Sequence, residues 1–232
     1  MSTGVVRSGP SPGPGSFNRA LLLVSIACGA LYLATQSLRP YTGSVVIKQL
    51  AIFPLALLAF RALRGADGLL LGLALAFSGL GDLFLGIEGE NLFTYGLGSF
   101  LIAHIFYVAL FARSLPRPLG LGSGRKLLIF LLLLYSAALT MWLGPALGPL
   151  AIPVIFYMSA ISAMCLTAIL AGFRTSLVVL GALLFILSDS LIAVTKFKMP
   201  IEHSNYLVWA TYYCGQLAIA TGFLREKLGP GR

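Results

Sequence analysis

Charge is scarce in this chain. Only 10% of its 232 residues are charged, whereas 58% are hydrophobic, and the mean hydropathy is +0.94. There are seven acidic residues and two histidines in all. Soluble domains carry far more charge than this. The composition therefore excludes a soluble globular protein and indicates a polytopic membrane protein.

Several common functional patterns are also missing. The sequence contains no P-loop and no zinc-binding spacing such as CxxC or HExxH. Three cysteines, Cys28, Cys165 and Cys214, all fall within hydrophobic runs, so we expect free buried thiols. We expect neither a metal site nor a cofactor. Any chemistry must then come from carboxylates assisted by Tyr, His and Lys side chains.

Eight hydrophobic runs are long enough to cross a bilayer. They do not alternate with period two and are too long for barrel strands, so they indicate helices. We predict an all-α polytopic membrane protein with about eight transmembrane helices, at residues 18–36, 44–61, 68–87, 92–112, 125–143, 150–172, 176–196 and 204–224. Residues 1–17, rich in Gly, Pro and Ser, predict a flexible cytoplasmic tail without a signal-peptide core. Residues 18–224 form one transmembrane domain, and 225–232 a short cytoplasmic tail.

The formal net charge of +9 is distributed unevenly between the loops. If the N-terminus lies inside, only four of the sixteen Lys and Arg residues fall at the outer ends of the runs: Arg39, Lys48, Lys196 and Lys198. The other twelve lie inside, which is the positive-inside pattern. Both termini are therefore expected in the cytoplasm, in a bacterial inner membrane or an endoplasmic reticulum membrane. We expect no nucleic-acid partner, and the pattern does not specify an oligomeric state.

Two aspartates lie inside hydrophobic runs, Asp82 in LALAFSGLGDLFLGI and Asp189 in LGALLFILSDSLIAV. A carboxylate at a helix centre costs roughly 2.5–3.5 kcal/mol even on lenient insertion scales, and it usually faces a protein interior or a watery cavity. Each aspartate follows a small residue, Gly81 or Ser188. Both runs travel outward, and Asp82 lies roughly 8 Å from the outer end of its run. We predict one shared polar pocket in the outer half of the bilayer.

Lys48, Tyr157 and Tyr212 are expected at the same depth as the two aspartates, in the outer half of the bilayer, and His104 is expected deeper, near mid-membrane. The candidate supporting residues are Lys48, Ser78, His104, Tyr107, Tyr157, Ser188, Tyr212 and Gln216. Ser78 is one turn before Asp82 and is expected to orient it. Structural alternatives stay open. Lys48 is also suited to snorkelling, the tyrosines to the interfacial aromatic belt, and Gly79, Gly81 and Gly181 to close helix packing.

The two aspartate-bearing runs are 107 residues apart and run in the same direction, which suggests a parallel four-plus-four repeat with a site between the halves. Two carboxylates in a pocket of low dielectric do not both ionise cheaply. One is then a neutral acid and the other an anion. Such a pair suits protonation of a weakly basic atom, stabilisation of the resulting cation and addition of water.

At these residues the sequence resembles the lysoplasmalogenase family, the YhhN-type integral membrane proteins. The resemblance rests on VIKQLAIFPLAL around Lys48, FSGLGDLFL around Asp82, GLGSFLIAHIFY, GALLFILSDSLIAVTKF around Asp189 and ATYYCGQL. It covers about residues 44–224. It implies a membrane hydrolase that cleaves the vinyl ether bond of a lysoplasmalogen, a lysophospholipid, to a fatty aldehyde and glycerophosphoethanolamine or glycerophosphocholine. Asp82 and Asp189 are the expected catalytic pair, and Lys48 is expected to hold the phosphate or tune the pair.

Transport is the alternative. Paired intramembrane acids in a repeated fold are also typical of proton- or cation-coupled carriers. A discontinuous helix would favour that function, and FSGLGD is the segment that would break. Against it, neither aspartate-bearing run contains a proline.

Overall fold

The computed structural model describes residues 14–87, 89, 91–116, 118 and 120–229, and over these residues it contains helices and no strands. The long helices are α1 (Pro14–Ala34), α2 (Ser44–Ala62), α3 (Gly65–Gly86), α4 (Leu92–Ala112), α5 (Ser123–Leu143), α6 (Ala151–Leu170), α7 (Leu177–Phe197) and α8 (Ser204–Leu228). Three short 3₁₀ helices, η1 (Gln36–Leu38), η2 (Gly144–Ala146) and η3 (Gly148–Leu150), lie between them. Within the described residues, eight helices are long and apolar enough to cross a membrane. The chain is a multi-pass membrane protein, as predicted.

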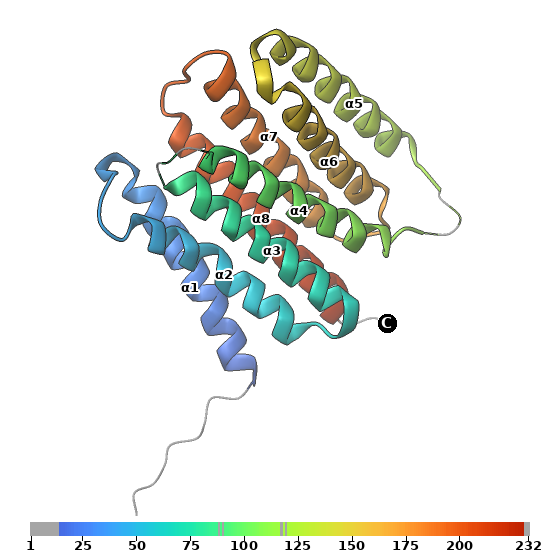
Figure 1. Cartoon of the computed structure of the whole chain (residues 1–232). Helices are drawn as coiled ribbons and strands as arrows, with labels where there is room; N and C mark the ends of the chain where they lie inside the picture. The colour runs from blue at the N-terminus through green and yellow to red at the C-terminus, as the bar shows by residue number, and fades with distance from the viewer. Residues whose placement is uncertain (1–13, 88, 90, 117, 119, 230–232) are drawn as a thin grey trace, which may run out of the picture.

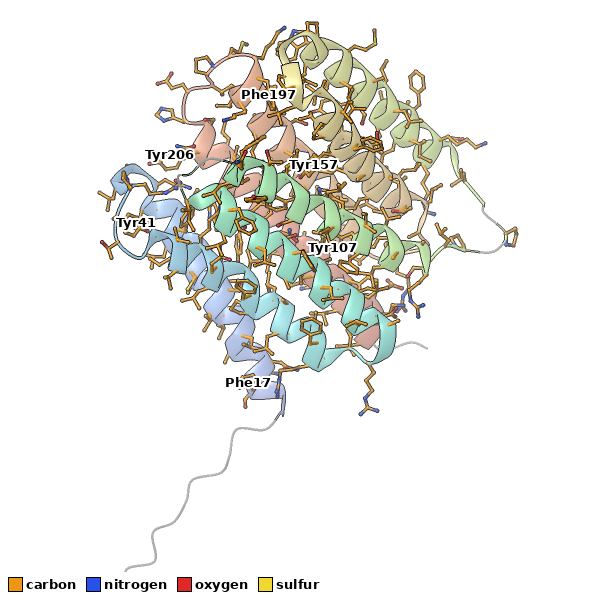
Figure 2. The ribbon with its side chains drawn as sticks, viewed as in Figure 1. Phe17, Tyr41, Tyr107, Tyr157, Phe197 and Tyr206 are labelled. Carbon is orange, nitrogen blue, oxygen red and sulfur yellow. The ribbon has the colours of Figure 1, made fainter. Side chains whose placement is uncertain are left out.

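The eight helices form one bundle (Figure 1). Helix α1 lies at one edge of it and α5 at the opposite edge, and these two are the least buried. Helix α8 packs against α7, α2 and α1, while α4 packs against α3 and α6. The end where α1, α3, α5 and α7 finish is called the cavity end, because the polar cavity described below lies there. Figure 2 shows Tyr41, Tyr206 and Phe197 at this end and Phe17 at the other.

Helices α7 and α8 make the closest crossing near the aspartate-bearing segment. A Cβ atom on Gly181 would lie 2.6 Å from the carbonyl oxygen of Gly215, so both glycines are required for the backbones to approach this closely. Next to Asp82, a Cβ atom on Gly81 would lie 2.5 Å from the Phe100 ring of α4. Small residues therefore bring together the helices that carry the polar side chains.

Helix ends differ from the predicted ones at both termini. Helix α1 begins at Pro14 rather than residue 18, and α8 continues to Leu228, beyond residue 224. The last turn of α8 is held by ion pairs, Lys227 with Asp67 of α3 at 2.8 Å and Glu226 with Arg174 at 3.4 Å. These pairs join the last turn of α8 to α3 and to the loop between α6 and α7, and the boundary of the C-terminal tail stays a prediction. Residues 1–13 and 230–232 lie outside the described residues.

The aspartate-bearing helices are unbroken. Helix α3 is continuous through FSGLGD, and α7 is continuous on both sides of Asp189. Helices α3 and α4 pack extensively, as do α7 and α8. The four-plus-four repeat stays a prediction, because such pairing does not require a duplication.

The three cysteines are free, but only Cys165 is buried. Cys28 is half-buried and Cys214 is exposed, contrary to the expectation of buried thiols. A membrane helix can present an apolar thiol to lipid, so burial within protein is unnecessary.

Candidate active site

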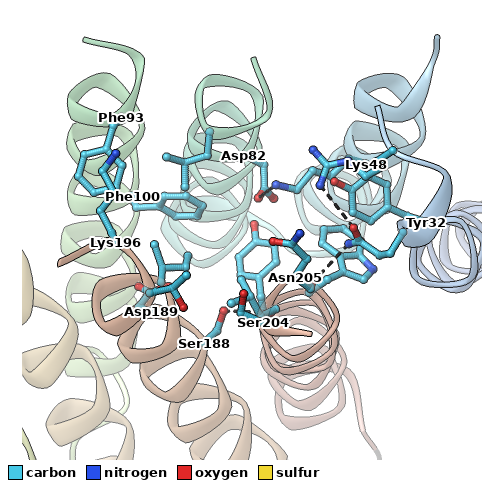
Figure 3. Close-up of a pocket in the computed structure, with 18 residues that line it drawn as sticks. Tyr32, Lys48, Asp82, Phe93, Phe100, Ser188, Asp189, Lys196, Ser204 and Asn205 are labelled. Atoms are coloured by element: carbon cyan, nitrogen blue, oxygen red, sulfur yellow. Dashed lines mark hydrogen bonds and ion pairs between the residues drawn. The ribbon is translucent and has the colours of Figure 1, made fainter. Parts of the chain in front are cut away.

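A cavity of about 330 Å³ lies at the cavity end, between η1 and helices α2, α3, α4, α7 and α8 (Figure 3). Its lining side chains with polar atoms are Tyr32, Gln36, Arg39, Lys48, Asp82, Ser188, Asp189, Thr195, Lys196, Ser204, Asn205, Trp209 and Tyr212. Both intramembrane aspartates thus line one cavity, and Lys48, Ser188 and Tyr212 line it with them. The segments that meet here are far apart in the sequence but were expected at similar depths.

Asp82 forms an ion pair with Lys48. The two side chains extend from α3 and α2, and Lys48 Nζ lies 2.7 Å from Asp82 Oδ1 (Figure 3). Lys48 is only 13% exposed, so its ammonium group points inward instead of snorkelling to the interface. The ammonium also lies 5.7 Å from the centroid of the Trp209 ring, within cation–π range. The second carboxylate oxygen, Asp82 Oδ2, is buried and makes no hydrogen bond of ordinary geometry among the described residues, although the Tyr212 hydroxyl lies close to the carboxylate.

Asp189 is contacted by a tyrosine and a histidine instead. The Tyr157 hydroxyl of α6 donates a short hydrogen bond to Asp189 Oδ2. His104 Nε2 of α4 lies 3.0 Å from the Tyr157 oxygen and 3.6 Å from Asp189 Oδ2. Because Tyr157 uses its proton for Asp189, its oxygen accepts from His104, which places the imidazole proton on Nε2. His104 Nδ1 is buried without a partner.

An apolar pocket of about 40 Å³ adjoins the cavity. It lies between α4, α6 and α7, and Leu97, Val154, Met158, Ala193 and Phe197 are among its lining residues. Phe100 and Asp189 line both the pocket and the cavity. Asp189 therefore lies at the boundary between a polar and an apolar space, whereas Asp82 lines only the polar one.

The other candidate residues have more distant roles. Tyr107 donates to Gln216 Oε1 at 2.5 Å, and neither side chain lines the cavity. Tyr212 lines the cavity, its hydroxyl lies close to the Asp82 carboxylate and to Gln216, and its ring packs edge-on against Phe100 and Phe185. Ser188 donates to the Val208 carbonyl at 3.0 Å, which joins α7 to α8.

Ser78 does not orient Asp82 as expected. Its hydroxyl donates to the Ala74 carbonyl at 2.9 Å, and it does not line the cavity. The hydroxyl of a serine within a helix can donate to the carbonyl four residues earlier without any change in the helical backbone. That local hydrogen bond satisfies the Ser78 hydroxyl.

Tyr32, Gln36, Arg39 and Trp209 are among the lining residues that were not sequence candidates. Gln36 and Arg39 lie at the end of the first predicted span, at the same end of the bundle as Lys48. This position in the sequence is the signal by which they could have been predicted to lie near the cavity. Trp209 donates from Nε1 to the Gly29 carbonyl at 3.0 Å, a contact that depends on how α1 packs against α8. Within the described part of the chain, no cluster of three or more His, Cys, Asp or Glu side chains could hold a metal ion.

The chain is similar to proteins from bacteria and mammals. A model of the YhhN family matches residues 43–223. Bovine lysoplasmalogenase TMEM86A is 33% identical over 217 residues, covering 86% of each protein, and human lysoplasmalogenase TMEM86A matches to the same extent. The lysoplasmalogenase of Mycobacterium bovis is 35% identical over 153 residues, covering 65% of this chain and 58% of the mycobacterial protein. The match thus spans less than two thirds of that relative. No solved structure matches the chain.

Proposed function

Because this chain belongs to the YhhN family, and because its bovine and mycobacterial relatives are named lysoplasmalogenases, we propose that it hydrolyses the vinyl ether bond of a lysoplasmalogen. The products are a fatty aldehyde and glycerophosphoethanolamine or glycerophosphocholine. One observation carries the mechanism: two intramembrane carboxylates line the same cavity in different electrostatic surroundings.

Asp82 serves as the anion. An ammonium group 2.7 Å from its carboxylate stabilises the negative charge within the membrane. Among the described residues its Oδ2 makes no hydrogen bond of ordinary geometry, although the Tyr212 hydroxyl lies close to the carboxylate, so Oδ2 is available to accept a hydrogen bond from a water molecule or to face a developing positive charge. Lys48 thus holds Asp82 in the charged state.

Asp189 serves as the acid. Its surroundings are a phenol, an imidazole and an apolar pocket, and no described Lys or Arg side chain forms an ion pair with it. Oδ2 accepts from Tyr157, which leaves Oδ1 to carry the proton. When that proton leaves, the Tyr157 hydroxyl stabilises the new carboxylate, and His104 stabilises Tyr157 in turn.

The position of Asp189 matches the chemistry of a vinyl ether. The proton must reach the outer alkene carbon, which is the carbon attached to the hydrocarbon chain. Asp189 lies where the cavity meets the apolar pocket, so a lipid whose first chain carbons occupy that pocket presents this carbon to it. The ether oxygen and the glycerol then lie toward Asp82 and Lys48.

The reaction proceeds in three steps. Asp189 transfers its proton to the outer alkene carbon, and the positive charge is shared by the inner carbon and the ether oxygen. Water attacks the inner carbon and gives a proton to Asp82, forming a hemiacetal. The bond to the glycerol oxygen then breaks as Asp82 returns its proton to that oxygen and the hemiacetal hydroxyl gives its proton to Asp189. Both carboxyl groups regain their starting states.

Two observations favour hydrolysis over coupled transport. Helix α3 has no break at FSGLGD, although an interrupted helix is typical of carrier sites. The relatives named above carry the name of an enzyme. We therefore retain the hydrolase.

The test is the release of aldehyde by the purified protein in detergent. The substrate is an alkenyl-lysophosphoethanolamine, and the control is the matching ester-linked lysolipid. We expect aldehyde from the vinyl ether and no cleavage of the ester. Well-folded protein that releases no aldehyde, or that cleaves the ester equally well, would refute the proposed function.

A further inference from the structure

The cavity contains more basic side chains than its carboxylates neutralise. Lys48 is neutralised by Asp82. Arg39 and Lys196 also line the cavity, and neither has a carboxylate within ion-pair distance among the described residues. The positive charge that remains is therefore carried by Arg39 and Lys196, and it suits an anionic ligand.

Arg39 is held in place by neighbours that, among the described residues, include no carboxylate within ion-pair distance. Its guanidinium lies 5.4 Å from the centroid of the Tyr32 ring, and Nη1 donates to Gln36 Oε1 at a long 3.4 Å. Gln36 is itself held by Asn205, whose carbonyl accepts from Gln36 Nε2 at 3.5 Å. The Arg39 Nε atom is buried and has no hydrogen-bond partner in the part of the chain that the structure describes. A planar guanidinium with free donors is the group best suited to a phosphate, which it can bind through two parallel hydrogen bonds.

Lys196 is placed differently. It is exposed, and its ammonium lies 5.0 Å from the centroid of the Phe93 ring, on the side of the cavity next to the apolar pocket. Figure 3 shows Lys196 beside Phe93 and Phe100, across the cavity from Lys48 and Tyr32. A phosphate bound at Lys196 would lie beside the apolar pocket. The polar side of the cavity, around Arg39 and Lys48, would then be empty.

We propose that Arg39 binds the phosphodiester of the lysolipid, in place of Lys48. This inference rests on the proposed function. The headgroup lies against Arg39, Gln36 and Asn205, the first chain carbons enter the apolar pocket, and the vinyl ether lies between them, at Asp82 and Asp189. Because Lys48 remains paired with Asp82, binding the phosphate does not remove the cation that keeps Asp82 charged.

The consequence is selectivity for phospholipids over neutral lipids. An alkenylglycerol without phosphate reaches the same carboxylates but forgoes the Arg39 contact. A hydrogen bond to a charged group changes affinity about tenfold or more, so the phospholipid should bind at least that much more tightly than the neutral lipid.

The test measures binding of ligands that cannot be hydrolysed, so that it does not depend on turnover. The probes are a saturated 1-O-alkyl-glycerophosphoethanolamine and the neutral 1-O-alkylglycerol of the same chain length, bound to the full-length protein in detergent. Arg39→Gln should weaken binding of the phospholipid about tenfold and leave the alkylglycerol unchanged. Lys198→Gln is the matched control. It removes one positive charge at the same end of the bundle, outside the cavity, and should change neither affinity.

Other outcomes overturn the inference. Equal weakening of both ligands by Arg39→Gln would make Arg39 structural, and unchanged phospholipid binding would place the phosphate elsewhere. Displacement of the phospholipid by inorganic phosphate as readily as by glycerophosphoethanolamine would indicate a site for free phosphate. Failure of the proposed function is distinguishable, because it would abolish aldehyde release by wild-type protein while leaving this binding comparison intact.

Discussion

The two aspartates share a cavity but not an environment. Asp82 pairs with a lysine ammonium at 2.7 Å, whereas Asp189 accepts from a tyrosine hydroxyl that is itself bonded to a histidine. Asp82 lines only the polar cavity, and Asp189 also lines the apolar pocket. An adjacent cation favours the charged carboxylate, while neutral donors and apolar walls tolerate a carboxylic acid. The same residue type can therefore take opposite roles a short distance apart.

Removing the acid should have the largest effect. Asp189→Asn keeps the size of the side chain and its acceptor for Tyr157 but cannot give up a proton to the alkene. We expect kcat for alkenyl-lysophosphoethanolamine to fall by about a hundredfold to ten-thousandfold, the range for loss of general acid catalysis. Thermal unfolding in detergent should change little, because no charge is left unpaired. A variant that folds normally and keeps its turnover would refute the role of Asp189.

Removing the anion should affect both activity and stability. Asp82→Asn leaves the Lys48 ammonium buried without its counter-charge, so Tm should fall by about 5–10 °C, and kcat should fall about a hundredfold or more. The double variant Lys48→Met/Asp82→Asn should regain most of the lost Tm, because both charges are gone, but not the lost activity. Recovery of activity in the double variant would show that the ion pair is only structural.

Deleting the donor to Asp189 should cost less. Tyr157→Phe removes the hydroxyl that stabilises the carboxylate as the proton leaves, and we expect kcat to fall about tenfold to a hundredfold, the value of a hydrogen bond to a charged group. KM should change little, since the ring stays in place. Tyr206→Phe, which removes a hydroxyl at the same end of the bundle but outside the cavity, serves as control. A fall of the same size in both variants would contradict a specific contact to Asp189.

Narrowing the apolar pocket should have the smallest effect. Ala193 lines the pocket beside Asp189, and Ala193→Leu fills space proposed for the first chain carbons. We expect KM to rise about threefold to tenfold, with kcat less affected. Ala138→Leu, on the exposed face of α5, makes the same change away from the pocket. An unchanged KM in the Ala193 variant would place the chain outside this pocket.

Much of the fold and part of the candidate site could be predicted from sequence. The eight spans follow from hydropathy because lipid leaves the backbone no solvent to bond, and their predicted positions agree with the helices to within a few residues. Asp82, Asp189, Lys48, Tyr157 and Tyr212 were predicted at similar depths, and depth depends only on distance along a helix of known rise. The structure places four of the five on one cavity, and Tyr157 lines the adjoining apolar pocket instead.

Partners could not be predicted in the same way, because they depend on how each helix is rotated and which helices are neighbours. The Ser78 hydroxyl donates to a carbonyl of its own helix, whereas the Tyr157 hydroxyl of α6 donates to Asp189 of α7. Arg39 enters the cavity only because η1 folds over the end of the bundle near Asn205. Depth alone does not distinguish these cases.

The sequence by itself determined that the chain crosses the membrane as about eight helices and that two costly carboxylates lie inside them. Those properties depend on local composition and on the free energy of transfer into lipid. Only the tertiary structure decided that Lys48 pairs with Asp82 and that Asp189 borders an apolar pocket. Both depend on contacts between segments far apart in the chain. Which side chains meet there depends on how each helix is rotated about its axis and on which helices are its neighbours.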